Sequence, residues 1–169
     1  MFTQTRFSSW GLSDEVQAAI DGLGWAYATE VQRDTVPMAR RGRDVIGQAR
    51  TGSGKTAAFG IPLIERCSPG AGLQALVLAP TRELAQQIEK VMRALGDYLN
   101  VKCHACVGGT SVREDQRILQ SGVHVVVGTP GRVYDMLRRR ALKPDYIKIF
   151  SLDRSEEHTS ELQSPDHLV

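Results

Sequence analysis

The fold depends on residues 49–56, Ala49-Arg50-Thr51-Gly52-Ser53-Gly54-Lys55-Thr56. These residues lie between an apolar run and a helical pattern, and a glycine-rich turn from a strand into a helix can point its backbone N–H groups at a phosphate. Lys55 would add a cation to the outer phosphates, and the Thr56 hydroxyl could hold magnesium. The stretch predicts a phosphate-binding loop. A purely structural glycine-rich turn is the alternative, because Ala49 stands where the general pattern has glycine.

Apolar, β-branched runs recur on both sides of this loop. They predict buried strands at residues 44–48, 74–79, 101–107, 123–128 and 147–152. Helical patterns between them fall at residues 55–67, 82–98, 112–120 and 131–139. Strands that alternate with helices predict an α/β fold, with a parallel sheet covered by helices on both faces. Ligands of such sheets bind at the carboxyl ends of the strands.

The first forty residues have a different pattern. Apolar residues at helical spacing predict a first helix between Ser13, its N-cap, and Gly24, where it stops. A second helix is expected to start at Thr29 and to be broken near Pro37.

Length and composition fit one ordinary domain. The chain has 169 residues, of which 41% are hydrophobic and 24% charged, and its formal net charge is +2. Such a mild excess of cations excludes nucleic-acid binding by charge alone, so any such contact must come from well-placed groups. No apolar run approaches the length of a membrane span, and residues 1–11 lack the pattern of a signal peptide. We expect a cytoplasmic protein that does not contact membranes.

Three cysteines, an odd number, argue against a disulfide framework. Cys103 and Cys106 form a Cys-x-x-Cys pair inside the predicted strand at residues 101–107. A zinc ribbon needs a second such pair, and a redox pair usually starts a helix. Small buried side chains are therefore the favoured interpretation, and metal or redox chemistry is the alternative.

Residues 154–169 are polar and aperiodic, and they cannot continue a buried sheet. They resemble a peptide that arises when sequencing-adapter DNA is translated by mistake. We expect a non-native or disordered tail after an incomplete domain at residues 1–153.

Six motifs, in order, resemble those of the DEAD-box RNA helicases. Residues 49–56 have that family's form of the loop, and residues 24–32 resemble its adenine-binding Q motif, with Phe7 as the upstream aromatic. The RNA-facing motifs are matched by residues 80–85, 108–109 and 129–132, and Leu152-Asp153 begins the Asp-Glu-Ala-Asp motif. Residues 90–153 look closest to the eukaryotic translation-initiation branch, whereas the first 80 look more bacterial or archaeal, so a chimera is an open alternative.

The resemblance implies a truncated RecA-like P-loop NTPase domain that uses ATP and Mg²⁺ and acts on RNA. The implied ATP contacts are Phe7, Trp25, Gln32, Ala49, Arg50, Thr51, Gly52, Ser53, Gly54, Lys55 and Thr56. The implied RNA contacts are Pro80, Thr81, Arg82, Gly108, Gly109, Thr129, Pro130, Gly131 and Arg132. Lys55 and Asp153 would be catalytic, with Thr56 and Asp153 holding the magnesium ion.

Several of these residues have a simpler alternative role. Gln32 would bond adenine, but Thr29-x-x-Gln32 is also a capping box. Thr81 and Thr129 look like N-caps of helices. The free N–H groups of a helix start attract phosphate, but N-cap threonines also occur in helices that bind nothing. Arg82 and Arg132 could each grip a phosphate with two parallel bonds. The family's usual phenylalanine and proline are replaced by Trp25 and Ala28.

The family's reaction requires a second RecA-like domain, which supplies arginines to the γ-phosphate. It also requires a glutamate after Asp153, where this chain has Arg154. We therefore expect an ATP-dependent RNA helicase fragment that is inactive by itself. The alternatives are a non-catalytic nucleotide- and RNA-binding module and, disfavoured by the motifs at Gln32, Arg82 and Arg132, a DNA-directed ATPase.

Overall fold

A parallel sheet lies at the centre of the computed structural model, which describes residues 1–50 and 52–154. Within those residues the strand order is β4-β5-β3-β6. The strands are β3 (Ala75–Leu78), β4 (Cys103–Cys106), β5 (Val125–Gly128) and β6 (Ile149–Leu152). Each occupies part of a predicted run, so these strands are confirmed. Thr51 and residues 155–169, most of the expected tail, lie outside the described residues.

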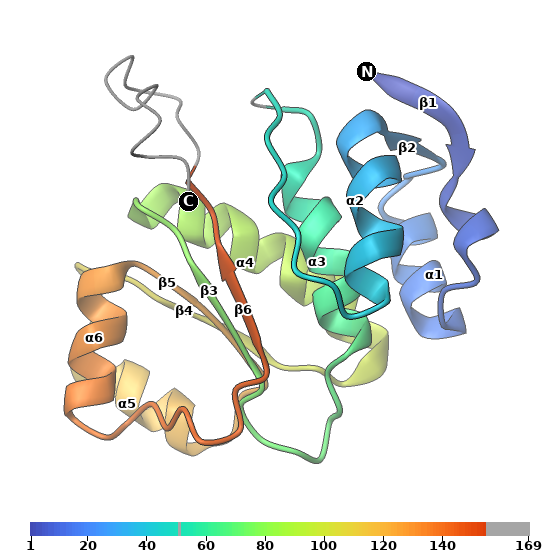
Figure 1. The fold of residues 1–169 in the computed structure, drawn as a ribbon. Coiled ribbons are helices and arrows are strands. Elements are labelled where there is room, and N and C mark those ends of the chain that lie inside the picture. The colour runs from blue at the N-terminus through green and yellow to red at the C-terminus, as the bar shows by residue number, and fades with distance from the viewer. Residues whose placement is uncertain (51, 155–169) are drawn as a thin grey trace.

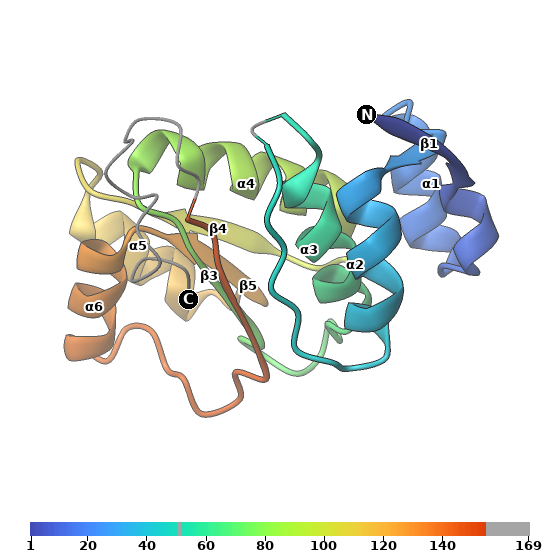
Figure 2. The ribbon, with the colours of Figure 1, turned by 45° about the horizontal axis from the view of Figure 1, so that its top comes forward.

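Helices cover both faces of this sheet, which confirms the predicted fold class (Figure 1). The helices after the loop are α3 (Lys55–Glu65), α4 (Arg82–Gly96), α5 (Val112–Gln120) and α6 (Pro130–Arg138), with a short 3-10 turn at η2 (Asp97–Leu99). Alternate strand residues point to opposite faces. Val77 and Val127 pack in the core with α3 and α4, whereas Leu76 and Val126 pack in a second core with α5 and α6. Figure 2 shows these helices around the strands.

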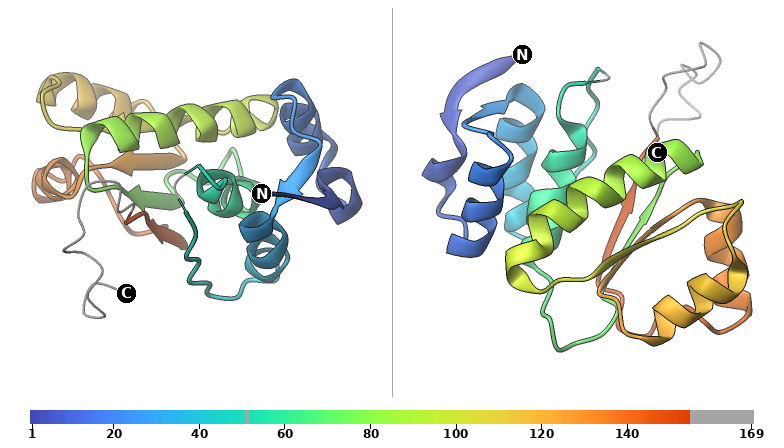
Figure 3. Two further views of the ribbon diagram at one scale, coloured as in Figure 1. Left: turned by 90° about the horizontal axis from the view of Figure 1, so that it is seen from above. Right: turned by 180° about the vertical axis from the view of Figure 1, so that it is seen from behind.

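The first forty residues form a separate group of elements at the end of the molecule away from α5 and α6 (Figure 3). They are β1 (Phe2–Arg6), η1 (Phe7–Trp10), α1 (Asp14–Gly22), β2 (Tyr27–Thr29) and α2 (Glu30–Arg40). The Ser13 hydroxyl accepts a bond from Val16 N at 3.3 Å, so the predicted cap is confirmed. The antiparallel β1–β2 pair was not predicted, because strands this short leave little periodicity.

The predicted strand at residues 44–48 does not form, and this prediction was wrong. Ile46 is 88% exposed, and a β-carbon on Gly47 would touch Thr35 and Val31 of α2. The segment therefore runs along α2 instead of joining the sheet. An apolar run becomes a strand only where a neighbouring strand accepts its backbone hydrogen bonds. Within the described residues no strand pairs with it.

The predicted break near Pro37 was also wrong, because α2 continues to Arg40. Proline removes one helical hydrogen bond. Contacts of the last turn compensate for that loss. Arg40 Nε donates to Glu65 Oε1 at 2.7 Å, and the same guanidinium donates to the carbonyl oxygens of Trp10 and Gly11. Val36, immediately before the proline, is fully buried.

Candidate functional site

The predicted motifs converge on one edge of the sheet because the strands are parallel and in register. Leu78 lies opposite both Gly128 and Leu152, and Cys106 also lies opposite Gly128. The chain therefore leaves all four described sheet strands at the same edge. Thr81 follows β3, Gly108 and Gly109 follow β4, and Thr129 follows β5. Asp153 follows β6.

The glycine-rich loop ends at Gly54, which is the N-cap of α3. Gly54 has a φ of 87°, a left-handed conformation that suits glycine. Lys55 and Thr56 form the first turn of α3, where helical N–H groups lack partners within the helix. Ser53 Oγ is buried and has no hydrogen-bond partner among the described residues. This end of α3 has the donors that an anion requires.

A cavity of about 460 Å³ joins the loop to the N-terminal elements. It is lined by Phe2, Phe7, Trp25, Tyr27, Thr29, Gln32, Gly52, Gly54, Lys55, Thr56, Ala57, Leu84, Gln87, Val91 and Asp153. Its size is that of a small-molecule site, with aromatic and apolar walls and a few polar groups. The sequence predicted the motif residues of this list. It missed Phe2, Ala57, Gln87 and Val91, which belong to no motif, and it assigned Leu84 to a motif expected to face RNA.

Three predicted ATP contacts line a different hollow. Ala49, Arg50 and Ser53 lie there beside Asp34 and Thr35 of α2. Thr51, a further predicted ATP contact, lies outside the described residues.

Gln32 forms the capping box that the sequence offered as an alternative. Its Oε1 accepts a bond from Thr29 N at 2.9 Å, and Thr29 Oγ1 accepts one from Gln32 N at 3.4 Å. The amide also donates from Nε2 to Gly54 O at 3.1 Å. Gln32 thus links the start of α2 to the glycine-rich loop. An amide has two N–H groups and two carbonyl lone pairs, so each atom keeps capacity for one further bond.

Substituting Gly54 is expected to disturb this link. A β-carbon there would stand 2.3 Å from Gln32 Nε2, whereas at Gly52, with a φ of 79°, it would meet nothing within 4 Å. Alanine costs about 1–2 kcal/mol in left-handed backbone. Gly54→Ala should lose a further ~1–3 kcal/mol of unfolding free energy by overpacking.

Urea denaturation measures the free energy of unfolding of Gly52→Ala and Gly54→Ala. Both variants have the same backbone strain, so the difference between their losses of stability reports the clash with Gln32. Equal losses of stability in the two variants would show that the contact with Gln32 is unimportant.

The aromatic end of the cavity is a packed cluster. Phe7 meets Trp10 edge to face at 5.2 Å between ring centroids, and Trp25 lies 6.2 Å from Phe7. Phe7 is only 2% exposed, so most of its surface is in the core, and Trp25 is half-buried. Arg6 stacks on Tyr27 and donates to its hydroxyl oxygen at 2.7 Å. These contacts hold the N-terminal segment against the cavity.

The predicted nucleic-acid motifs provide two exposed helix starts beside a glycine turn. Thr81 Oγ1 caps α4 by accepting from Leu84 N at 3.2 Å, so the threonine is a true N-cap. Thr129 precedes Pro130 at the start of α6 without a side-chain cap. Gly109 has a φ of 86°, and a β-carbon on it would stand 2.5 Å from Arg82 Nη1. The positive φ favours glycine at this turn, and the end of the Arg82 side chain lies beside it.

Arg132 is placed differently from Arg82. Its side chain is 10% exposed, and Nη1 donates to Asp115 Oδ2 at 2.7 Å. The same guanidinium donates to Thr110 O at 2.9 Å. Arg82, by contrast, is 51% exposed. The predicted two-bond grip on phosphate therefore suits Arg82, whereas Arg132 ties α6 to the loop before α5.

The Cys-x-x-Cys pair is separated by the sheet. Cys103 packs in the core on the α3–α4 side, and Cys106 is buried in the core on the α5–α6 side. Strand residues three apart point to opposite faces. The two thiols therefore cannot act together as one metal or redox pair.

In the described residues no helix is long and apolar enough to span a bilayer.

Known proteins resemble this chain in sequence and in fold. A sequence model of the DEAD/DEAH box helicases matches residues 29–164. Eukaryotic initiation factor 4A of Zea mays is 59% identical over 155 residues, which are 91% of this chain and 38% of that protein. Eukaryotic initiation factor 4A-8 of Nicotiana tabacum is 57% identical with the same coverage. These relatives confirm the expected likeness to the translation-initiation branch, and the chain spans 38% of their length.

Two solved structures share the fold. A DEAD box protein from the hyperthermophile Methanococcus jannaschii gives a TM-score of 0.82 at 35% identity, covering 91% of this chain and 42% of that one. A Saccharomyces cerevisiae dbp5 variant, bound to gle1 and ip6, gives 0.81 at 33% identity, covering 89% and 38%. The expected RecA-like fold is thereby confirmed. By sequence and by structure, this chain belongs to the DEAD/DEAH box helicase family.

Proposed function

We propose that residues 1–153 are the first ATP-binding domain of an ATP-dependent RNA helicase. The whole protein would use ATP hydrolysis to open short RNA duplexes or displace bound proteins. The observation that carries this proposal is the single cavity in which Gln32, Lys55 and Asp153 meet. Residues 121 apart in sequence converge there, and each matches a family motif for a different part of MgATP.

The residues present fit ATP with Mg²⁺. The N-terminus of α3 has donors suited to phosphates, as does Ser53 Oγ, which has no hydrogen-bond partner among the described residues. Lys55 adds a positive charge. Thr56 and Asp153 would hold the magnesium ion, which supplies positive charge to the β- and γ-phosphates when bound. The remaining N–H and lone pair of Gln32 suit the adenine N7 and N6 groups. Trp25 lines the same end of the cavity.

RNA would lie along the edge formed by Thr81, Arg82, Gly108, Gly109 and the start of α6. Exposed N–H groups and Arg82 recognise phosphate, so binding should depend little on base sequence. Arg132 would act indirectly, by holding the loop through Thr110. A second RecA-like domain would complete the ATP site with its arginines.

Gln32→Glu tests adenine recognition. The variant keeps the acceptor for Thr29 N, but it loses the donor to adenine N7 and the donor to Gly54 O. A lost hydrogen bond is worth about 0.5–1.5 kcal/mol, so preference for ATP over GTP should fall about two- to tenfold. Competition of each nucleotide against a fluorescent ATP analogue measures this preference.

Thr29→Ala is the matched control, because it removes the cap for Gln32 N and leaves the amide side chain in place. It should cost about 1 kcal/mol of stability and keep the preference for ATP. If Thr29→Ala lost that preference as fully as Gln32→Glu, Gln32 would be only a structural cap.

A further inference from the structure

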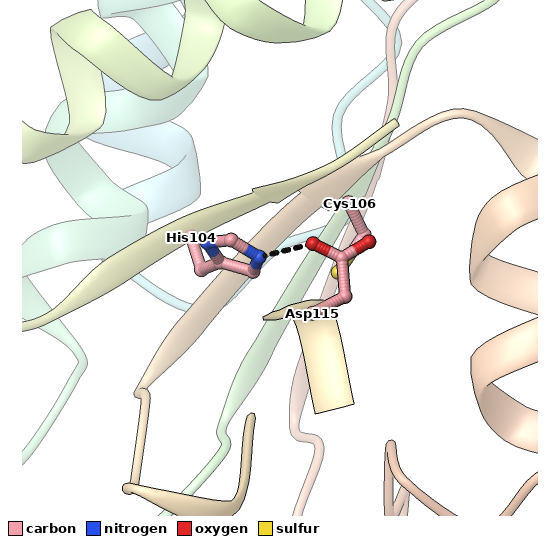
Figure 4. Close-up of side chains that lie close together, drawn as sticks. All are labelled: His104, Cys106 and Asp115. Atoms are coloured by element: carbon pink, nitrogen blue, oxygen red, sulfur yellow. Dashed lines mark hydrogen bonds and ion pairs between the residues drawn. The ribbon is translucent and has the colours of Figure 1, made fainter. Parts of the chain in front are cut away.

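A cluster of metal-ligating side chains lies away from the nucleotide cavity, between β4 and α5. His104, Cys106 and Asp115 each contribute one ligand atom, and these atoms all lie within 4.8 Å of one another (Figure 4). His104 and Cys106 are two residues apart on one strand, so they share a face of the sheet. Asp115 reaches that face from the first turn of α5.

We propose that His104, Cys106 and Asp115 form a binding site for a divalent cation of the zinc class. Imidazole, thiolate and carboxylate are all ligands of Zn²⁺, whereas imidazole and thiolate are poor ligands for Mg²⁺. Three protein ligands leave a fourth tetrahedral position for water. The site is independent of the proposed helicase function, since it rests on this geometry alone.

The hydrogen bonds around Asp115 suit a shared carboxylate. Its Oδ1 is bonded to His104 Nε2 at 2.8 Å, and its Oδ2 accepts from Arg132 Nη1 at 2.7 Å. A cation between Oδ1 and the imidazole would replace the first bond and leave the second intact. Arg132 then acts as the outer partner that orients a ligating carboxylate. The side chain of His104 is 16% exposed, which gives an entry path.

Protons must leave when the cation binds. Burial, and then the Asp115 charge, raise the pKa of the Cys106 thiol to about 12, so without a cation the thiol is protonated. A coordinated divalent cation deprotonates a thiol, and the proton passes to solvent. Any proton on His104 Nε2 moves to Nδ1, so that the lone pair of Nε2 faces the metal.

Cobalt titration tests the site, because a thiolate bound to Co²⁺ gives a charge-transfer absorption that histidine and carboxylate ligands alone do not. We expect one Co²⁺ per 169-residue chain with this band. Cys103→Ala is the matched control, since Cys103 lies on the same strand but on the opposite face. It should keep the band, and Cys106→Ala should lose it.

His104→Gln adds a second variant that keeps a donor for Asp115 but removes the imidazole. Its affinity for Co²⁺ should fall at least about tenfold. Zn²⁺ should also raise the Tm of the wild-type chain, because it binds the folded state, and it should not raise that of Cys106→Ala. The proposal is overturned if the wild-type chain gives no thiolate band, if the band is lost with Cys103 instead of Cys106, or if His104→Gln binds Co²⁺ unchanged.

Discussion

A polypeptide of residues 1–169 is expected to hydrolyse ATP in the presence of RNA about 10³- to 10⁵-fold more slowly than a two-domain relative. The reason lies in the proposed division of the ATP site. This domain supplies the phosphate loop and Asp153, whereas arginines of a second domain would stabilise the charge that develops on the γ-phosphate. Arg154 adds a smaller deficit, since it stands where the family has the glutamate that orients water.

Steady-state phosphate release with and without RNA distinguishes the two causes. Three polypeptides are compared: residues 1–169, the same chain with Glu-Ala-Asp in place of residues 154–156, and a two-domain protein built from the Zea mays relative. The second polypeptide should gain little over the first. RNA-stimulated release by residues 1–169 at a rate near the third would contradict the proposed roles of Asp153 and Arg154. Nucleotide binding without turnover in the third would favour a non-catalytic module.

Lys55→Ala should weaken ATP binding about ten- to a hundredfold. Lys55 lines the cavity beside Gly54 and Thr56 at the start of α3. The substitution removes a charge-assisted hydrogen bond to phosphate worth about 1.5–3 kcal/mol. Stability should change little, because alanine is a good helix former. Titration with a fluorescent ATP analogue measures the change in affinity.

Lys143→Ala is the control for loss of one positive charge. Lys143 is exposed and does not line the cavity. It should leave the affinity for ATP unchanged. If Lys55→Ala bound the analogue as tightly as Lys143→Ala, residues 49–56 would not be the phosphate site.

Local patterns predicted most of the secondary structure. The helix at Val112–Gln120 has the predicted bounds, and Ser13 and Thr81 are caps as expected. Helix starts and strand alternation depend on residues close together in the chain, so they can be predicted from the sequence. Residues 44–48 have the same apolar, β-branched pattern as true strands. They differ only in lacking a neighbouring strand among the described residues, which no local pattern records.

The role of Gln32 also depends on contacts that a local sequence pattern does not record. Its sequence context supports both a capping bond and an adenine contact. The structure adds a third bond, to Gly54, which lies 22 residues away. Arg132 likewise has the same predicted role as Arg82 in the sequence, but in the structure it is bonded to Asp115. Both cases depend on side chains from other elements.

The α/β class, the glycine-rich loop, the family and the order of its motifs could all be predicted from the sequence. These follow from residue types at short spacings, whose chemistry and periodicity do not require the chain to be folded. The folded chain was needed to establish which apolar runs form strands, that Gln32 links α2 to the loop, and that Cys103 and Cys106 lie on opposite faces. It also brought His104 and Cys106 to Asp115. Hydrogen bonds and packing between residues distant in sequence form only when the chain folds, so a local sequence pattern does not predict them.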